Sequence, residues 1–174
     1  MTLLEAIKDR HSIRAYKDQP LADDVVKVLE EQIAFLNKEG ELHMQLILNE
    51  PKAFKGPIAK YGMFRNANNY IVVAGKKADD LDERVGYYGE HLVLLAQTLG
   101  LNTCWVGLSY SKEPGTYVLD EGEKIACYIA IGYRKSRTCP IYFLYLFINI
   151  CRRIILNKFT FKVPVVIVVP PLSQ

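Results

Sequence analysis

The first forty residues show two stretches in which apolar side chains recur at helical spacing. The first has an apolar face made of Leu3, Leu4 and Ile7. Thr2 and Glu5 stand at the spacing of a capping box, which predicts a helix from about Leu3 to Arg10. The second recurs at Val25, Val26, Leu29, Ile33 and Leu36. It predicts a second helix that stops at Gly40, because glycine readily adopts the left-handed backbone conformation common just after a helix.

Four later stretches have the apolar patterns of strands. Residues 42–48 alternate apolar and polar side chains, and the runs NYIVVAG, LNTCWVG and KIACYIAIG are typical of buried strands. Between the first two of these runs, residues 82–99 return to the helical period, and Gly100 closes them. Strand, helix and strand over residues 70–107 suit a crossover unit. The expected fold class is therefore mixed α/β (α+β), with a central sheet flanked by helices.

The last forty residues differ from the rest. Residues 134–174 carry seven Lys and Arg and no acidic side chain, whereas residues 1–133 carry 15 basic and 19 acidic ones. The tail also holds two apolar runs, and neither reaches the roughly 18 residues that suggest a membrane span. We therefore expect a folded domain over residues 1–134, an atypical basic and apolar tail over 135–174, and no transmembrane segment.

Composition narrows the class of protein. Half of the residues are hydrophobic and the net charge is +3, a globular profile that gives no support to nucleic-acid binding. The first 30 residues lack the apolar run of a signal peptide, which favours a cytoplasmic protein. The four cysteines, Cys104, Cys127, Cys139 and Cys151, form no CxxC pair, so we expect reduced thiols. The histidines are also far apart in sequence, and no metal-ligand spacing is present, so no metal site is expected.

The segment RHSIR, residues 10–14, concentrates donors for an anion. Arginine offers planar, forked donors that suit phosphate, and serine adds a hydroxyl. If the segment is extended, Arg10, Ser12 and Arg14 share one face and form a clamp for a phosphorylated ligand. The alternative is a solvated basic turn after the first helix.

The segment TCWVGLS, residues 103–109, ends a predicted strand, where α/β sheets commonly bind ligands. Gly107 would allow a backbone N–H to approach a flat ligand closely. Trp105 either packs beside such a ring or fills the core. In the preceding helix, Gly86 and Gly89 either mark a face against which another backbone packs or are simply tolerated.

These segments occur in an order that resembles the nitroreductase family of FMN-dependent enzymes. The resemblance covers about residues 1–134 and rests on RHSIRAYKDQPL, NYIVVAGKK, ERVGYYGEHLVLLAQTLGLNTCWVGL and IACYIAIGY. It implies that Arg10, His11, Ser12 and Arg14 bind FMN, and that Trp105, Val106 and Gly107 face the flavin ring. Lys135 and Arg137 imitate a basic loop that contacts the phosphate in the family. No catalytic side chain is implied, since the flavin carries the chemistry.

The resemblance also implies a function. A homodimer would bind FMN at its subunit interface and pass electrons from NAD(P)H through FMN to a nitroaromatic, quinone or similar small-molecule acceptor, in a ping-pong reaction. The chain departs from the family in lacking an Ala-Pro-Ser-x-Asn-like segment and in its tail. Two other hypotheses therefore stay open: a truncated flavin-binding remnant without turnover, and an interaction protein that uses the basic apolar tail at a membrane surface.

Overall fold

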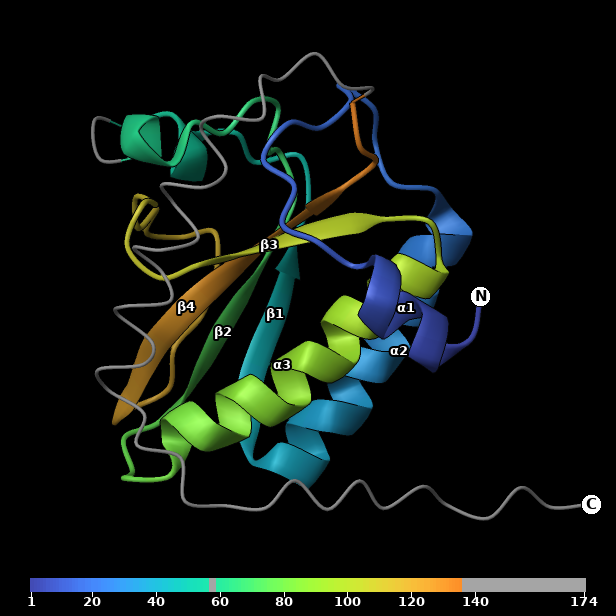
Figure 1. Cartoon of the computed structure of the whole chain (residues 1–174). Helices are drawn as coiled ribbons and strands as arrows, with labels where there is room; N and C mark the ends of the chain where they lie inside the picture. The colour runs from blue at the N-terminus through green and yellow to red at the C-terminus, as the bar shows by residue number, and fades with distance from the viewer. Residues whose placement is uncertain (57–58, 136–174) are drawn as a thin grey trace, which may run out of the picture. The chain divides into compact units, whose positions relative to one another are not determined.

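The computed structural model describes residues 1–56 and 59–135 of the chain (Figure 1). The predicted tail beyond Lys135, with Arg137, Cys139 and Cys151, lies outside these residues. The elements run in the order α1 Leu3–Asp9, α2 Asp23–Gly40, β1 Leu42–Ile47, η1 Lys52–Phe54, η2 Ala59–Gly62, β2 Tyr70–Lys76, α3 Leu81–Thr98, β3 Asn102–Val106 and β4 Glu123–Gly132. Each predicted helix and strand is present, which confirms the mixed α+β class.

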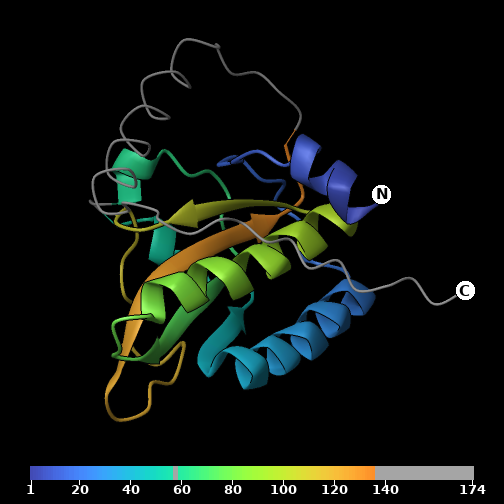
Figure 2. The same cartoon turned by 60° about the horizontal axis from the view of Figure 1, so that its bottom comes forward.

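The four strands form one sheet in the order β1-β2-β4-β3, and each neighbouring pair is antiparallel. Because β2 and β3 are both antiparallel to β4, they run parallel to each other with β4 between them. The predicted crossover over residues 70–107 is therefore confirmed, with α3 as its helix. Figure 2 shows α2 and α3 side by side across one face of the sheet.

The sheet is buried on both faces, and this explains the unbroken apolar run of β2. Ile71 and Val73 pack toward α2 and α3 with Leu29, Leu36 and Leu92. Tyr70 and Val72 point to the opposite face and join a second cluster with Phe54, Tyr128 and Ala130. A strand that is covered on both sides has no solvent face and so needs no polar alternation.

The second face is covered by irregular chain and the short helices η1 and η2 instead of a long helix. The side-chain amide of Gln45 donates to Val118 O at 2.6 Å, and its carbonyl accepts from Val118 N–H at 2.9 Å. Tyr110 stacks on Tyr128 with ring centroids 3.9 Å apart. These contacts fix the β3–β4 segment, residues 107–122, against the sheet.

The capping prediction for α1 is confirmed, but its apolar face is not covered. The backbone N–H of Thr2 donates to Glu5 Oε2 at 2.8 Å, and Glu5 N–H donates to Thr2 Oγ1 at 3.3 Å. Only Ala6 of this helix is buried. The three side chains of the predicted apolar face are more than half exposed: Leu3 59%, Leu4 71% and Ile7 55%.

The prediction for Gly40 is wrong in one respect. Gly40 is the last helical residue, and Glu41 takes the left-handed conformation at φ 48°. The Arg84 guanidinium compensates by donating to Gly40 O at 2.8 Å and Glu41 O at 3.0 Å. Gly40 is needed for a different reason, because a Cβ there would collide with the ring of Tyr88.

The two glycines of α3 have different surroundings. A Cβ on Gly89 would collide with the indole of Trp105, whereas one on Gly86 would meet nothing within 4 Å. Close packing is thus the reason for Gly89, with a side chain as its partner rather than a backbone. Within the described single chain, no contact explains Gly86.

We predict opposite effects of alanine at these two positions. Gly86→Ala should stabilise the fold by about 1 kcal/mol, because glycine is a poor helix former and the space is open. Gly89→Ala should destabilise it by about 1–3 kcal/mol, because the new methyl group displaces Trp105. Urea denaturation of both variants measures the difference. Equal shifts in the same direction would contradict the packing described here.

Candidate functional site

The RHSIR segment leaves α1 in an extended conformation and lies along the free edge of β3. Arg10 has φ −63° and ψ 128°, and Ile13 N–H donates to Thr103 O at 3.0 Å. The following residues pair with two other segments. Ala15 forms a bridge with Arg65, and Tyr16 forms one with Arg134. The extended backbone that the phosphate-clamp hypothesis requires is therefore present.

Tyr16 fixes this segment to the sheet. Its ring is buried, and its hydroxyl donates toward two carbonyls, Ile13 O at 2.6 Å and Ala130 O at 3.2 Å. The ring also lies over Gly132, where a Cβ would be 2.9 Å from it. Burial raises the pKa of this hydroxyl well above its ordinary value, so Tyr16 stays neutral. A neutral donor at this place holds the basic residues without adding charge.

Glu90 of α3 joins the two predicted binding motifs. Its Oε1 lies 3.5 Å from Arg10 Nε, and its Oε2 accepts a hydrogen bond from Trp105 Nε1 at 3.1 Å. Arg10 and Trp105 are therefore neighbours although 95 positions separate their numbers. The outer edge of the six-membered ring of Trp105 packs on Gly89. Trp105 is thus half-buried between the helix and β3, and is tied to the basic segment through one carboxylate.

One donor of Arg10 is left over in this arrangement. Arg10 Nη1 is shielded from solvent, and none of the residues that the structure describes accepts a hydrogen bond from it. A buried cationic N–H without an acceptor is costly. An anionic or carbonyl oxygen of a ligand would satisfy it after a small side-chain rotation.

The other predicted binding residues differ in how far they are exposed to solvent. Ser12 is exposed, and Arg14 is partly buried in the same extended segment. His11 is exposed, with Nδ1 2.9 Å from Asp9 O. Lys135 lies beside the segment, because its N–H donates to Ala15 O at 3.0 Å. The structure thus brings the backbone of Lys135 next to that of Ala15, the residue after Arg14.

The last two side chains of β3 point to opposite faces of the sheet. Val106 is buried in the second core cluster, whereas Trp105 packs on the α3 side. Gly107 follows the strand, is exposed, and has open space where a Cβ would stand. Leu108 beside it is 78% exposed. A flat ligand could therefore approach the backbone of Gly107 without displacing a described side chain.

A cavity of about 450 Å³ lies beside Asp18, which follows the extended segment. Among its lining residues are Asp18, Phe54, Arg65 and Lys135. Of the described residues predicted for flavin, only Lys135 contributes to it.

Comparison with known proteins identifies the family of this chain. The family model described as "Putative TM nitroreductase" matches residues 2–152. The chain belongs to this nitroreductase family. No curated protein gives a significant match. The family match covers the whole basic segment and the end of β3, and it extends into the region that we expected to be an atypical tail.

Solved structures of nitroreductases share the fold. An FMN-dependent nitroreductase from Clostridium difficile is 19% identical with a TM-score of 0.59, and the match covers 92% of this chain and 99% of that one. A nitroreductase with bound FMN from Bacteroides fragilis is 21% identical with a TM-score of 0.58, covering 81% and 96%. At these identities the likeness shows the fold alone.

Sequence reasoning missed Glu90 in this nitroreductase. Its neighbours in sequence, GYYGEHLV, only indicate a helix, and Arg10 is too distant for any spacing rule. The helical period alone would place Glu90 on a half-buried position next to Gly89. Its role follows only from the packing of α1 and β3 against the same part of α3.

Replacing Glu90 should loosen both motifs together. Glu90→Ala removes the acceptor of the Trp105 indole and the partner of Arg10, at a cost of about 1–2 kcal/mol in stability. Trp105 is the only tryptophan of the chain, so its fluorescence spectrum should shift. Glu31→Ala, at an exposed position of α2, is the matched control and should change stability by less than about 0.5 kcal/mol. Identical behaviour of the two variants would refute the role of Glu90.

Proposed function

We propose that this nitroreductase binds FMN along the RHSIR segment and the end of β3, and acts as an FMN-dependent oxidoreductase. The observation that carries the proposal is the convergence of the two motifs on Glu90, with a leftover donor on Arg10. The open space at Gly107 supports it, because it leaves room for a flat ring. Membership of the family and the FMN-containing relatives of the same fold support the choice of cofactor.

Each residue of the site has a distinct proposed part. Arg10, Ser12 and Arg14 offer donors to the phosphate and the polar edge of the flavin, and His11 adds an exposed imidazole. Lys135, together with Arg137 outside the described residues, contributes further positive charge. The backbone N–H at Val106 or Gly107 donates to the polar edge of the ring, and Trp105 packs nearby. Bound FMN supplies the redox chemistry, so no residue needs to act as acid or nucleophile.

Glu90 would act through Arg10. An unpaired guanidinium on a flexible stem samples many rotamers, and fixing it costs conformational entropy when a ligand binds. The ion pair with Glu90 restricts Arg10 before the ligand arrives. Because Glu90 is negative, it also lowers the net positive charge of the site, so that phosphate attraction rests mainly on Arg14 and the lysine.

The electron donor, acceptor and assembly are parts of the same proposal. We propose NAD(P)H as donor, a nitroaromatic, quinone or related small molecule as acceptor, and a cytoplasmic homodimer. The exposed apolar face of α1 supports a dimer, because three large aliphatic side chains side by side are an unusual surface for a monomer. Within the described residues, no helix is both long and apolar enough to cross a membrane.

The phosphate clamp predicts weaker FMN binding in single variants. Arg14→Ala should lose about ten- to a hundredfold in affinity, because a charge-assisted hydrogen bond is worth about 1.5–3 kcal/mol. Ser12→Ala should lose less, since a neutral hydroxyl contributes about 1 kcal/mol. Quenching of flavin fluorescence during titration measures both.

Lys8→Ala is the matched control, because Lys8 is an exposed cation of α1 just outside the motif. Its affinity for FMN should stay within about twofold of the wild type, since a screened surface charge contributes little. If Arg14→Ala and Ser12→Ala bind FMN as tightly as Lys8→Ala does, the segment is only a solvated basic turn.

A substitution at Gly107 tests whether the end of β3 belongs to the flavin site. Gly107→Val should leave the fold intact, because the space before it is open, yet lose flavin, because the new side chain occupies the place of the ring. Gly86→Val, also in open space but on α3, should keep its flavin. Flavin content and circular dichroism are measured for both. A Gly107→Val protein with full flavin would remove the end of β3 from the site.

A further inference from the structure

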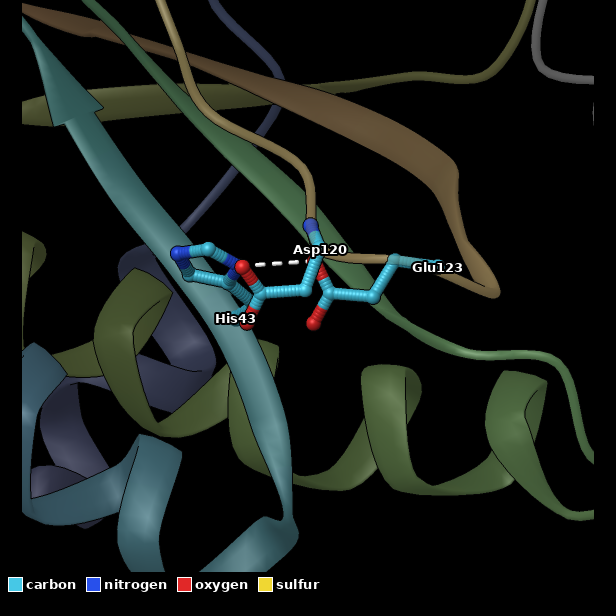
Figure 3. A group of neighbouring side chains, drawn as sticks. All are labelled: His43, Asp120 and Glu123. Atoms are coloured by element: carbon cyan, nitrogen blue, oxygen red, sulfur yellow. Dashed lines mark hydrogen bonds and ion pairs between the residues drawn. The ribbon is translucent and has the colours of Figure 1, made fainter.

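A second cluster of polar side chains lies far from the basic segment. His43 comes from β1, Asp120 from the end of the β3–β4 segment, and Glu123 from the first residue of β4 (Figure 3). His43 points away from α2 and α3, because its neighbours Leu42 and Met44 occupy that core. The three side chains point toward one another, and their potential ligand atoms all lie within 4.8 Å of one another.

Glu123 is the fixed centre of this cluster. Its side chain is only 7% exposed. One oxygen, Oε2, lies 2.7 Å from His43 Nδ1 and accepts from Asp120 N–H at 2.8 Å. Burial acts to raise the pKa of the carboxyl, but the hydrogen bonds from Asp120 N–H and His43, aided by the charge of Lys76, outweigh it and hold the pKa below its ordinary value. Glu123 is therefore an ionised, positioned ligand.

Asp120 supplies a second carboxylate from the solvent side. Its side chain is exposed, and no residue in the described part of the chain forms a hydrogen bond or ion pair with it. Two carboxylates at this distance repel each other, so a cation between them would stabilise the arrangement. Lys76 acts on Glu123 with its positive charge.

The composition and spacing of the cluster point to a kind of ion. Nitrogen and carboxylate ligands bind Zn²⁺ at about 2.0–2.2 Å in tetrahedral geometry, so two ligand atoms on one ion are about 3.3–3.6 Å apart. Side-chain rotations would open the 2.7 Å between His43 Nδ1 and Glu123 Oε2 and bring Asp120 to a similar separation. An imidazole ligand favours Zn²⁺ and similar ions over Mg²⁺ and Ca²⁺, and two carboxylates neutralise a divalent charge.

We propose that His43, Asp120 and Glu123 bind one divalent transition-metal ion, with Zn²⁺ as the representative. The ion replaces the proton between His43 and Glu123, which is released to solvent, and leaves a fourth position to water. It would join β1 to the β3–β4 segment beside the Gln45–Val118 hydrogen bonds, and so hold the segment that starts at Gly107 against the sheet.

The test is a Zn²⁺ titration of the full-length protein after chelator treatment, in competition with a chromophoric chelator. The wild type should bind one equivalent through this cluster. Asp120→Asn and His43→Gln should each weaken that binding more than about tenfold, since each removes a direct ligand. Asp120→Asn keeps the fold, because only the backbone of Asp120 is hydrogen-bonded in the described chain. Asp79→Asn, an exposed carboxylate elsewhere, is the control and should bind as the wild type does.

Cobalt distinguishes this cluster from the cysteines. Co²⁺ bound by nitrogen and oxygen ligands gives a visible spectrum without the near-ultraviolet charge-transfer band of a thiolate, and we expect such a spectrum here. A thiolate band would place the ion on a cysteine and overturn the proposal. Failure of the wild type to bind one equivalent, or unchanged affinity in both Asp120→Asn and His43→Gln, would also overturn it.

Discussion

The docking of residues 13–17 onto the sheet is the constraint on which the candidate site depends. The backbone of Ile13 donates to Thr103 at the edge of β3, and two further backbone hydrogen bonds join the segment to Tyr133 and Lys135. Tyr16 fixes the same segment from inside the core through its hydroxyl and ring. Because the segment is held at both ends, Arg10 is placed beside α3 and Lys135 beside Ala15. Unpaired strand edges need such cover, and here the cover carries the basic residues.

The docking also allows Glu90 to contact both the N-terminal segment and β3. One carboxylate receives Arg10 from the N-terminal segment and Trp105 from β3, so two segments distant in sequence become one surface. Gly89 makes this possible, because any larger residue would push the indole away. The candidate site of this nitroreductase is thus centred on Glu90 in the middle of α3, and β3 adds Trp105, Val106 and the backbone of Gly107 that follows it.

Local patterns predicted most of the fold, because each element carries its own signal. The capping box at Thr2, the alternation in β1 and the apolar runs of β2 and β4 are all readable in short windows. Glu90 and the cluster around Glu123 are not readable in this way, since His43 and Glu123 are 80 positions apart and meet only through sheet pairing. Gly40 was misread because the ring of Tyr88, and not helix termination, requires a glycine there.

The most direct test of the account is the absorption spectrum of the purified full-length protein, before and after addition of NADPH without oxygen. The account predicts a yellow protein with flavin absorption, release of FMN on denaturation, bleaching by the nicotinamide, and recovery of the colour when a quinone is added. A colourless protein that takes up no FMN would contradict it. Bound FMN that no nicotinamide can reduce would reject the proposed turnover and leave a flavin-binding remnant.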